Sequence, residues 1–142
     1  MKLKDLIKSK GFEVIAVDSE TSVADAIRKM VDRNIGALLI MEDGRTVGMF
    51  TERDVLTCWV RRGDFLGTRI GDVMTTELVV AEVEDDLNYA MSIMIQRGVR
   101  HLPVLDRGRL VSVLSIRDVV KAQVSNLQAE VHYLKDFISD IG

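Results

Sequence analysis

Two short segments of this chain place a hydroxyl three residues before a carboxylate. They are Thr51-Glu52-Arg53-Asp54 and Ser115-Ile116-Arg117-Asp118, and each follows an apolar run and precedes a helix-like pattern. A hydroxyl with an acid at the third position forms a capping box at a helix start. The same groups suit a second chemistry, because a carboxylate accepts two hydrogen bonds from the vicinal hydroxyls of a ribose while the helix N–H groups face a phosphate. The two roles are compatible.

The two segments are equivalent positions of an internal repeat. Residues 13–55 align without gaps on residues 77–119, and 12 of the 43 pairs are identical. Self-similarity at a fixed offset indicates two copies of one folding unit. Each copy, of about 64 residues, is small for an independent core, so we expect the copies to pack on each other.

Each copy shows the order strand, helix, strand, strand, helix, which predicts a mixed α/β (α+β) fold. The first copy has apolar runs at 14–17, 35–41 and 46–50, and a helical pattern that starts at Val23 after Ser22. Asp43-Gly44 is typical of a tight hairpin turn. The second copy repeats the order at 78–83, 87–96, 100–105 and 110–114.

Composition excludes several classes of function. A net charge of -3 with interspersed signs argues against a nucleic acid or an anionic membrane as the main partner. The longest apolar runs are too short to cross a bilayer, and the single cysteine, Cys58, excludes an internal disulfide, so we expect a cytoplasmic protein. Only His101 and His132 are histidines, and no catalytic or metal-binding motif is present, so we expect no enzyme activity and no metal site.

Three motifs give the chain a specific resemblance. Gly48–Asp54, Arg97–Val104 and Ile70–Thr75 resemble a tandem pair of CBS domains, also called a Bateman module, and the likeness covers roughly residues 11 to 120. It implies two β-α-β-β-α repeats packed as a pseudo-twofold pair, to which the heptad pattern described below adds a long C-terminal helix. The predicted domain boundaries are 1–60 for the N-terminal extension and first repeat, 61–76 for a linker, 77–120 for the second repeat and 121–142 for the C-terminal extension.

The resemblance also implies two crossed sites for an adenosine-containing ligand in the cleft between the repeats. Thr51 and Asp54 are completed by Val79, Val99, Arg100, His101 and Pro103 of the second copy, and Ser115 and Asp118 are completed by Ile15, Ile35, Gly36 and Ala37 of the first. Only the first site has basic side chains for a phosphate, so the resemblance implies that the sites differ. Arg100 and His101 are equally typical of a solvated strand end, and Pro103 is expected at a strand edge or an irregularity.

The C-terminal segment carries a heptad pattern. Apolar residues recur at alternating spacings of four and three, at Val120, Val124, Leu127, Val131, Leu134, Ile138 and Ile141. The five from Val124 to Ile138 form two classes, each with a spacing of seven residues. Val or Ile occupies one class and Leu the other, the arrangement favoured by parallel two-stranded coiled coils. The pattern leaves two interpretations open, a helix packed on its own module or a helix paired between subunits.

The function that the resemblance implies is a non-catalytic regulatory module that binds AMP, ADP, ATP or NAD, without a covalent cofactor. Paired CBS modules commonly associate, so a homodimer through the repeat helices and the C-terminal helix is expected, and the downstream protein partner is left unspecified. The alternative is a homodimeric scaffold of the same fold that does not bind nucleotide.

Overall fold

The chain forms two compact units, which are described separately. The computed structural model describes the backbone of residues 1–10 and 14–141 and the side chains of residues 1–9 and 14–138, so Glu13 of the repeat alignment and the side chain of Ile141 in the heptad pattern lie outside it. Unit 1 combines Met1–Phe12 with Val79–Gly142, and unit 2 is Glu13–Leu78. The expected mixed α/β class is confirmed, because each unit holds one three-stranded sheet with its helices.

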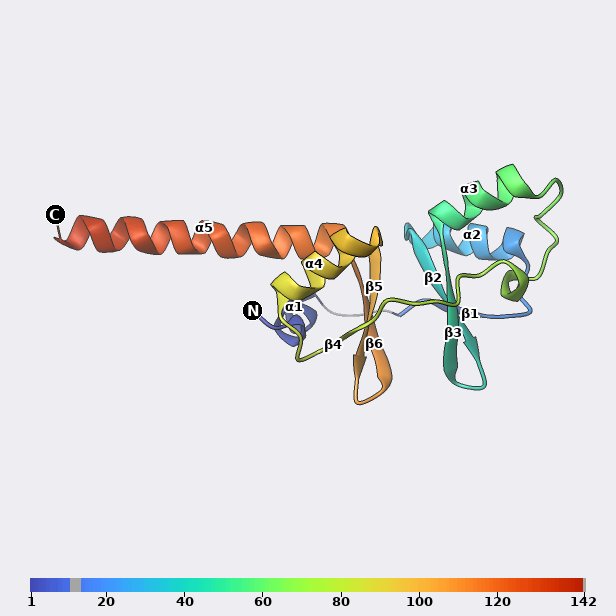
Figure 1. Ribbon diagram of the computed structural model, residues 1–142, viewed down its shortest axis with the longest axis horizontal. Coiled ribbons are helices and arrows are strands. Elements are labelled where there is room, and N and C mark those ends of the chain that lie inside the picture. The colour runs from blue at the N-terminus through green and yellow to red at the C-terminus, as the bar shows by residue number, and fades with distance from the viewer. Residues whose placement is uncertain (11–13, 142) are drawn as a thin grey trace. The chain divides into compact units, whose positions relative to one another are not determined.

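Unit 2 contains the first repeat (Figure 1). Its elements are β1 (Ala16–Asp18), α2 (Val23–Arg33), β2 (Ala37–Glu42), β3 (Arg45–Thr51), α3 (Glu52–Arg61) and a 3-10 turn (Ile70–Asp72). β1 pairs parallel with β2, and β2 pairs antiparallel with β3. The buried core consists of Val23, Ala26, Met30, Leu38, Ile40, Phe50, Cys58, Phe65 and Ile70.

Unit 1 contains the second repeat with the same sheet. Its elements are α1 (Leu3–Lys10), β4 (Ala81–Glu82), α4 (Leu87–Arg97), β5 (His101–Asp106), β6 (Arg109–Ser115) and the long α5 (Ile116–Ile141). Within this unit α5 runs beside α4 at its start and then continues past it as a single straight rod (Figure 1). Among the described residues, no helix has the length and apolar character needed to cross a bilayer.

The two hairpins match each other residue by residue. Asp43 and Gly44 turn with φ of 50° and 76°, and Arg107 and Gly108 with 52° and 78°. Each hairpin has a register shift at the same place, between Ile40 and Met41 and between Val104 and Leu105. The repeat read from the sequence is therefore a repeat of local geometry.

The N-terminal segment packs on the second repeat as the linker packs on the first. Leu3 N–H donates to the Asp85 carbonyl at 2.9 Å, and Ile70 N–H donates to the Thr21 carbonyl at 2.7 Å. The next residues continue the match, with Lys4 donating to Val83 at 2.9 Å and Gly71 donating to Ser19 at 3.0 Å. Leu3 and Ile70 are both fully buried. Residues 1–9 thus help to complete the core of unit 1, a role that an alignment beginning at residue 13 does not reveal.

Pro103 explains why β4 is shorter than β1. In unit 2 the Leu39 N–H donates to the Ile15 carbonyl at 3.2 Å, which opens the ladder between β1 and β2. The equivalent pair in unit 1 is Pro103 and Val79, and proline has no N–H to donate. The ladder of β4 therefore begins one residue later, at Ala81 opposite Val104. Of the two alternatives expected for Pro103, a strand edge or an irregularity, the structure shows the irregularity, because β5 is the central strand of its sheet.

Gly48 lets the linker lie against β3. The backbone of Thr75 both donates to and accepts from Met49, at 2.8 and 2.9 Å, so the linker pairs with β3 at this point. A Cβ at Gly48 would lie 2.5 Å from the sulfur of Met74 and 3.0 Å from the Thr75 carbonyl oxygen. The second repeat has Ser112 at this position, fully buried and without a hydrogen-bond partner for its hydroxyl among the described residues.

Gly48→Ala is expected to lower the free energy of unfolding by about 1–3 kcal/mol, since the added methyl overpacks the contact with the linker. Urea denaturation followed by Trp59 fluorescence measures the change, because the only tryptophan of the chain lies in unit 2. Gly67→Ala is the matched control, because nothing lies within 4 Å of its Cβ position. Equal midpoints for the two variants would contradict the close approach.

Candidate functional site

The first hydroxyl and carboxylate pair forms a complete capping box at the start of α3. Thr51 N–H donates to Asp54 Oδ2 at 2.9 Å, and Asp54 N–H donates to Thr51 Oγ1 at 3.3 Å. The Thr51 hydroxyl also donates to Asp54 Oδ2, at 3.2 Å. The β3-to-α3 turn is closed further by Glu52 N–H, which donates to the Gly36 carbonyl at 3.1 Å. Both side chains stay half-buried, so they are fixed in place without being sealed from solvent.

Thr75 brings a second hydroxyl to this carboxylate, and it is not among the site residues predicted from the sequence. Its Oγ1 donates to Asp54, lying 3.1 Å from Oδ1 and 3.3 Å from Oδ2. The backbone pairing of Thr75 with Met49 carries the linker to this position. Oδ2 thus receives the three donors of Thr51 and Thr75, whereas the Thr75 hydroxyl is the donor seen on Oδ1 among the described residues. The Oδ1 edge is the part of Asp54 most available to a ligand.

The second pair forms the same box at the start of α5. Ser115 N–H donates to Asp118 Oδ2 at 2.9 Å, and Asp118 N–H donates to Ser115 Oγ at 3.1 Å. Ile116 N–H donates to the Arg100 carbonyl at 2.8 Å, as Glu52 does to Gly36 in the other unit. The capping role of both segments is confirmed.

Two pairs of predicted site residues adjoin the box of their own repeat, Gly36 and Ala37 in unit 2 and Arg100 and His101 in unit 1. In unit 2, Ala37 is the register partner of Thr51, and in unit 1, His101 is the register partner of Ser115. Arg100 is exposed, Pro103 is buried, and the other members are half-buried: Ile15, Ile35, Gly36, Ala37, Val79, Val99 and His101. The crossed pairing joins residues of different units and stays a prediction.

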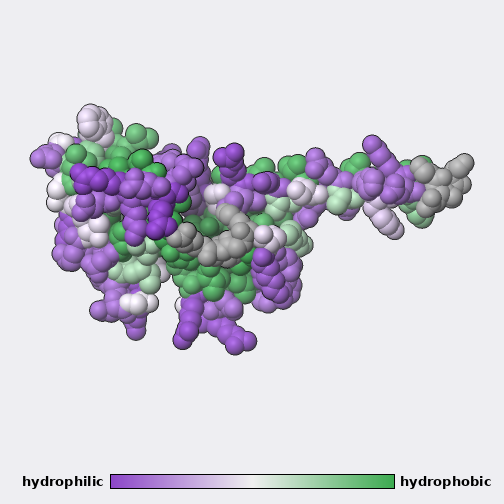
Figure 2. All heavy atoms as spheres, turned by 180° about the vertical axis from the view of Figure 1, so that it is seen from behind, coloured by the Kyte–Doolittle hydropathy of each residue, from purple (hydrophilic) through white to green (hydrophobic). Residues whose placement is uncertain are grey.

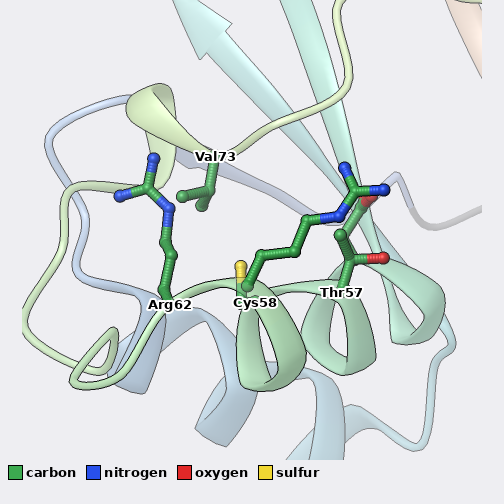
Figure 3. Close-up of a pocket in the computed structure, with 6 residues that line it drawn as sticks. Thr57, Cys58, Arg62 and Val73 are labelled. Atoms are coloured by element: carbon green, nitrogen blue, oxygen red, sulfur yellow. The ribbon is translucent and has the colours of Figure 1, made fainter.

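A shallow depression of about 240 Å³ adjoins Asp54 in unit 2. It is lined by Asp54, Thr57, Cys58, Arg61, Arg62 and Val73. Figure 3 shows Cys58 pointing up from α3, with Val73 of the linker and the Arg62 side chain beside it. Burial raises the pKa of the Cys58 thiol, and Arg62 opposes this only in part. A neutral thiol is a poor nucleophile, so this depression offers cationic and polar contacts and no activated sulfur.

Comparison with known proteins places the chain in a family. The model of the CBS domain matches it twice, at residues 3–61 and 70–125. The chain is 32% identical to "CBS domain-containing protein CBSX3, mitochondrial" of Arabidopsis thaliana, over 96% of this chain and 71% of that protein.

Two solved structures extend the comparison to the fold. The CBS domain protein NE2398 is 35% identical with a TM-score of 0.83, covering 87% of this chain and 98% of that one. CBSX2 in complex with AMP is 25% identical with a TM-score of 0.73, covering 87% and 96%. Two matched domains, two sheets of one topology and two capping boxes at equivalent positions agree with one another, and the chain belongs to the CBS domain family as a tandem pair.

Proposed function

We propose that this protein is a non-catalytic regulatory module that binds an adenosine-containing ligand, with Asp54 as the acceptor for the ribose hydroxyls. The arrangement at Asp54 carries the proposal. Its carboxylate is held by the Thr51 backbone, half-buried, and already accepts a hydroxyl from Thr75 on the Oδ1 edge. A ribose diol supplies two such hydroxyls and would take the place of Thr75 on that edge. The AMP complex of CBSX2 supports adenosine as the ligand class.

The other residues take roles that follow from their chemistry. Arg100 offers a forked donor and His101 a second nitrogen donor, so this pair is assigned to phosphate. Val79 and Val99 are assigned to the faces of the base, and Pro103 leaves the Val79 carbonyl without a donor from β5, which suits an exocyclic amino group. Ser115 and Asp118, with Ile15, Ile35, Gly36 and Ala37, are assigned to a second site of the same kind that lacks basic side chains.

A ligand panel tests the proposal. AMP, ADP, ATP, NAD and S-adenosylmethionine are titrated against the protein in thermal unfolding, with inosine monophosphate as the control for the amino group. A ligand at 100 times its dissociation constant is expected to stabilise the protein by about 2.7 kcal/mol. The melting temperature then rises by several degrees. Unchanged melting with every adenosine compound, at concentrations up to the millimolar range, would contradict adenosine binding.

That negative outcome would favour the second candidate, a homodimeric scaffold that does not bind nucleotide. The apolar surface of the helices supports association in either case. On α3, Leu56, Trp59 and Val60 lie on one helical face with exposed fractions of 68%, 74% and 81%. We propose a second copy of the chain as the partner of the repeat helices, since a contiguous exposed apolar face of this kind is typical of an interaction surface.

A further inference from the structure

The outer two thirds of α5 carry an apolar stripe that stays exposed among the described residues of unit 1. Exposed fractions along it are 47% for Val124, 50% for Leu127, 52% for Val131, 53% for Leu134 and 65% for Ile138. Figure 2 shows hydrophobic residues recurring along the projecting helix between hydrophilic ones. Five large apolar side chains on one face of a single helix mark an interaction site.

The helix does not depend on a partner for its existence. The Ser115 and Asp118 box caps its first turn, Val119 is fully buried, and Ala122 packs against the core of unit 1. Helix nucleation is the costly step, and here it is completed inside the folded unit. A partner therefore meets a helix that is already formed, and little ordering entropy opposes pairing.

The residue classes on the stripe fit a parallel partner. Val124, Val131 and Ile138 form one class of the heptad, and Leu127 and Leu134 form the other. β-branched residues in the first class with leucine in the second favour two parallel strands. A second copy of this same helix has the matching classes at the matching positions.

The charges flanking the stripe select the same geometry. Glu130 directly precedes Val131 in the sequence, and Lys135 directly follows Leu134. The two charged residues therefore border the stripe on opposite sides, five residues apart. In a parallel pair in register, this spacing brings Glu130 of one copy next to Lys135 of the other, twice per dimer. In an antiparallel pair, Glu130 instead faces the same heptad position of the other helix, so it does not meet Lys135 and the attraction is lost.

We propose that α5 pairs with α5 of a second copy as a parallel, in-register coiled coil over residues 124–138. The pairing covers the stripe and joins Glu130 to the partner's Lys135. It is independent of nucleotide binding, and it leaves the two units of each copy free to carry out their own function.

The first test removes the stripe. Leu127→Lys with Leu134→Lys is compared with Ser125→Lys with His132→Lys, which adds the same two lysines seven residues apart on another face. Both pairs are made in a Leu56→Ser, Trp59→Ser background, which removes the exposed apolar face of α3. Sedimentation equilibrium is expected to show that the first pair of changes raises the dissociation constant of self-association by about 100-fold or more, because it places charges in the apolar stripe. The control pair is expected to leave it within about threefold. Circular dichroism checks that both variants keep the helix, and equal association of the two variants would overturn the proposal.

The second test addresses direction. Glu130→Lys alone and Lys135→Glu alone are each expected to weaken the association about 3- to 30-fold, and the double exchange to restore it. In a Cys58→Ala background, Leu134→Cys is expected to form an intersubunit disulfide on air oxidation, whereas His132→Cys is not. The cross-link reports contact between the two α5 stripes even where the repeat helices also associate. Failure of the rescue together with failure of the Leu134→Cys cross-link would overturn the parallel register.

Discussion

Leu3→Ala is expected to lower the free energy of unfolding of unit 1 by about 2–5 kcal/mol, although the residue lies at the extreme N-terminus. Leu3 is fully buried in the core that contains Leu87, Leu102 and Leu114. Its truncation removes apolar contacts and leaves a cavity that the sheet and α4 fill only in part. Chemical denaturation followed by circular dichroism at 222 nm measures the loss, since α1, α4 and α5 all belong to this unit.

The matched variant in the other unit is Ile70→Ala, which removes the equivalent buried side chain from the linker. The same loss is expected there, read by Trp59 fluorescence. Leu66→Ala, at a residue that is 49% exposed, is the control and is expected to cost less than about 1 kcal/mol. A loss below 1 kcal/mol for Leu3→Ala would show that the N-terminal segment does not contribute to the core.

Asp54→Asn is expected to weaken adenosine-ligand binding by about 10- to 100-fold. The amide still accepts from Thr51 N–H and preserves the capping box, but it removes the charge and one acceptor from the ribose contact. Hydrogen bonds to charged groups contribute about 1.5–3 kcal/mol each, which corresponds to this range. Isothermal titration calorimetry with the tightest ligand of the panel measures the change. Asp118→Asn is expected to cost less, and equal or reversed losses would contradict the difference between the two sites.

Thr75→Val tests whether the Thr75 hydroxyl competes with the ribose for the Asp54 carboxylate. Valine keeps the shape of the side chain and the backbone pairing with Met49, but it removes the hydroxyl that lies on Oδ1 of Asp54. If the ribose replaces this hydroxyl, affinity should rise by about threefold to tenfold. A weaker affinity in this variant would instead place Thr75 among the groups that hold the ligand.

The elements of each repeat could be predicted because their signals are local. Helical spacing after Ser22, the Asp-Gly turn and alternating apolar runs predicted α2, the first hairpin and their counterparts within a few residues. The first strand of the second copy is the main difference, expected at 78–83 and observed only at Ala81–Glu82. The cause is a missing donor on the neighbouring strand, at Pro103, which the pattern of the strand itself does not contain.

Two parts of the molecule depend on contacts that the sequence does not display. The N-terminal residues 3–7 correspond to residues 70–74 at an offset of 67, three more than the repeat, and they share only Asp5 with Asp72. Thr75 contacts Asp54 across 21 residues, and its place at the end of the Ile70–Thr75 motif does not by itself assign it to the site. Both contacts follow from tertiary packing, so an ungapped alignment could not predict them.

Unit 1 is built from two separate segments of the chain, and this affects the order in which the units can fold during translation. Unit 2 is continuous in sequence, whereas Leu3 of α1 bonds to the Asp85 carbonyl and packs in a core built from residues that follow unit 2. At 5–20 residues per second, the ribosome needs roughly 3–13 s to add the 64 residues that follow unit 2. During this interval the nascent chain exposes Leu3 and Leu6 on an amphipathic segment, where a chaperone can bind them. The second repeat is therefore the one that captures the segment preceding the first repeat, and α5 is synthesised after the strands that cover α1.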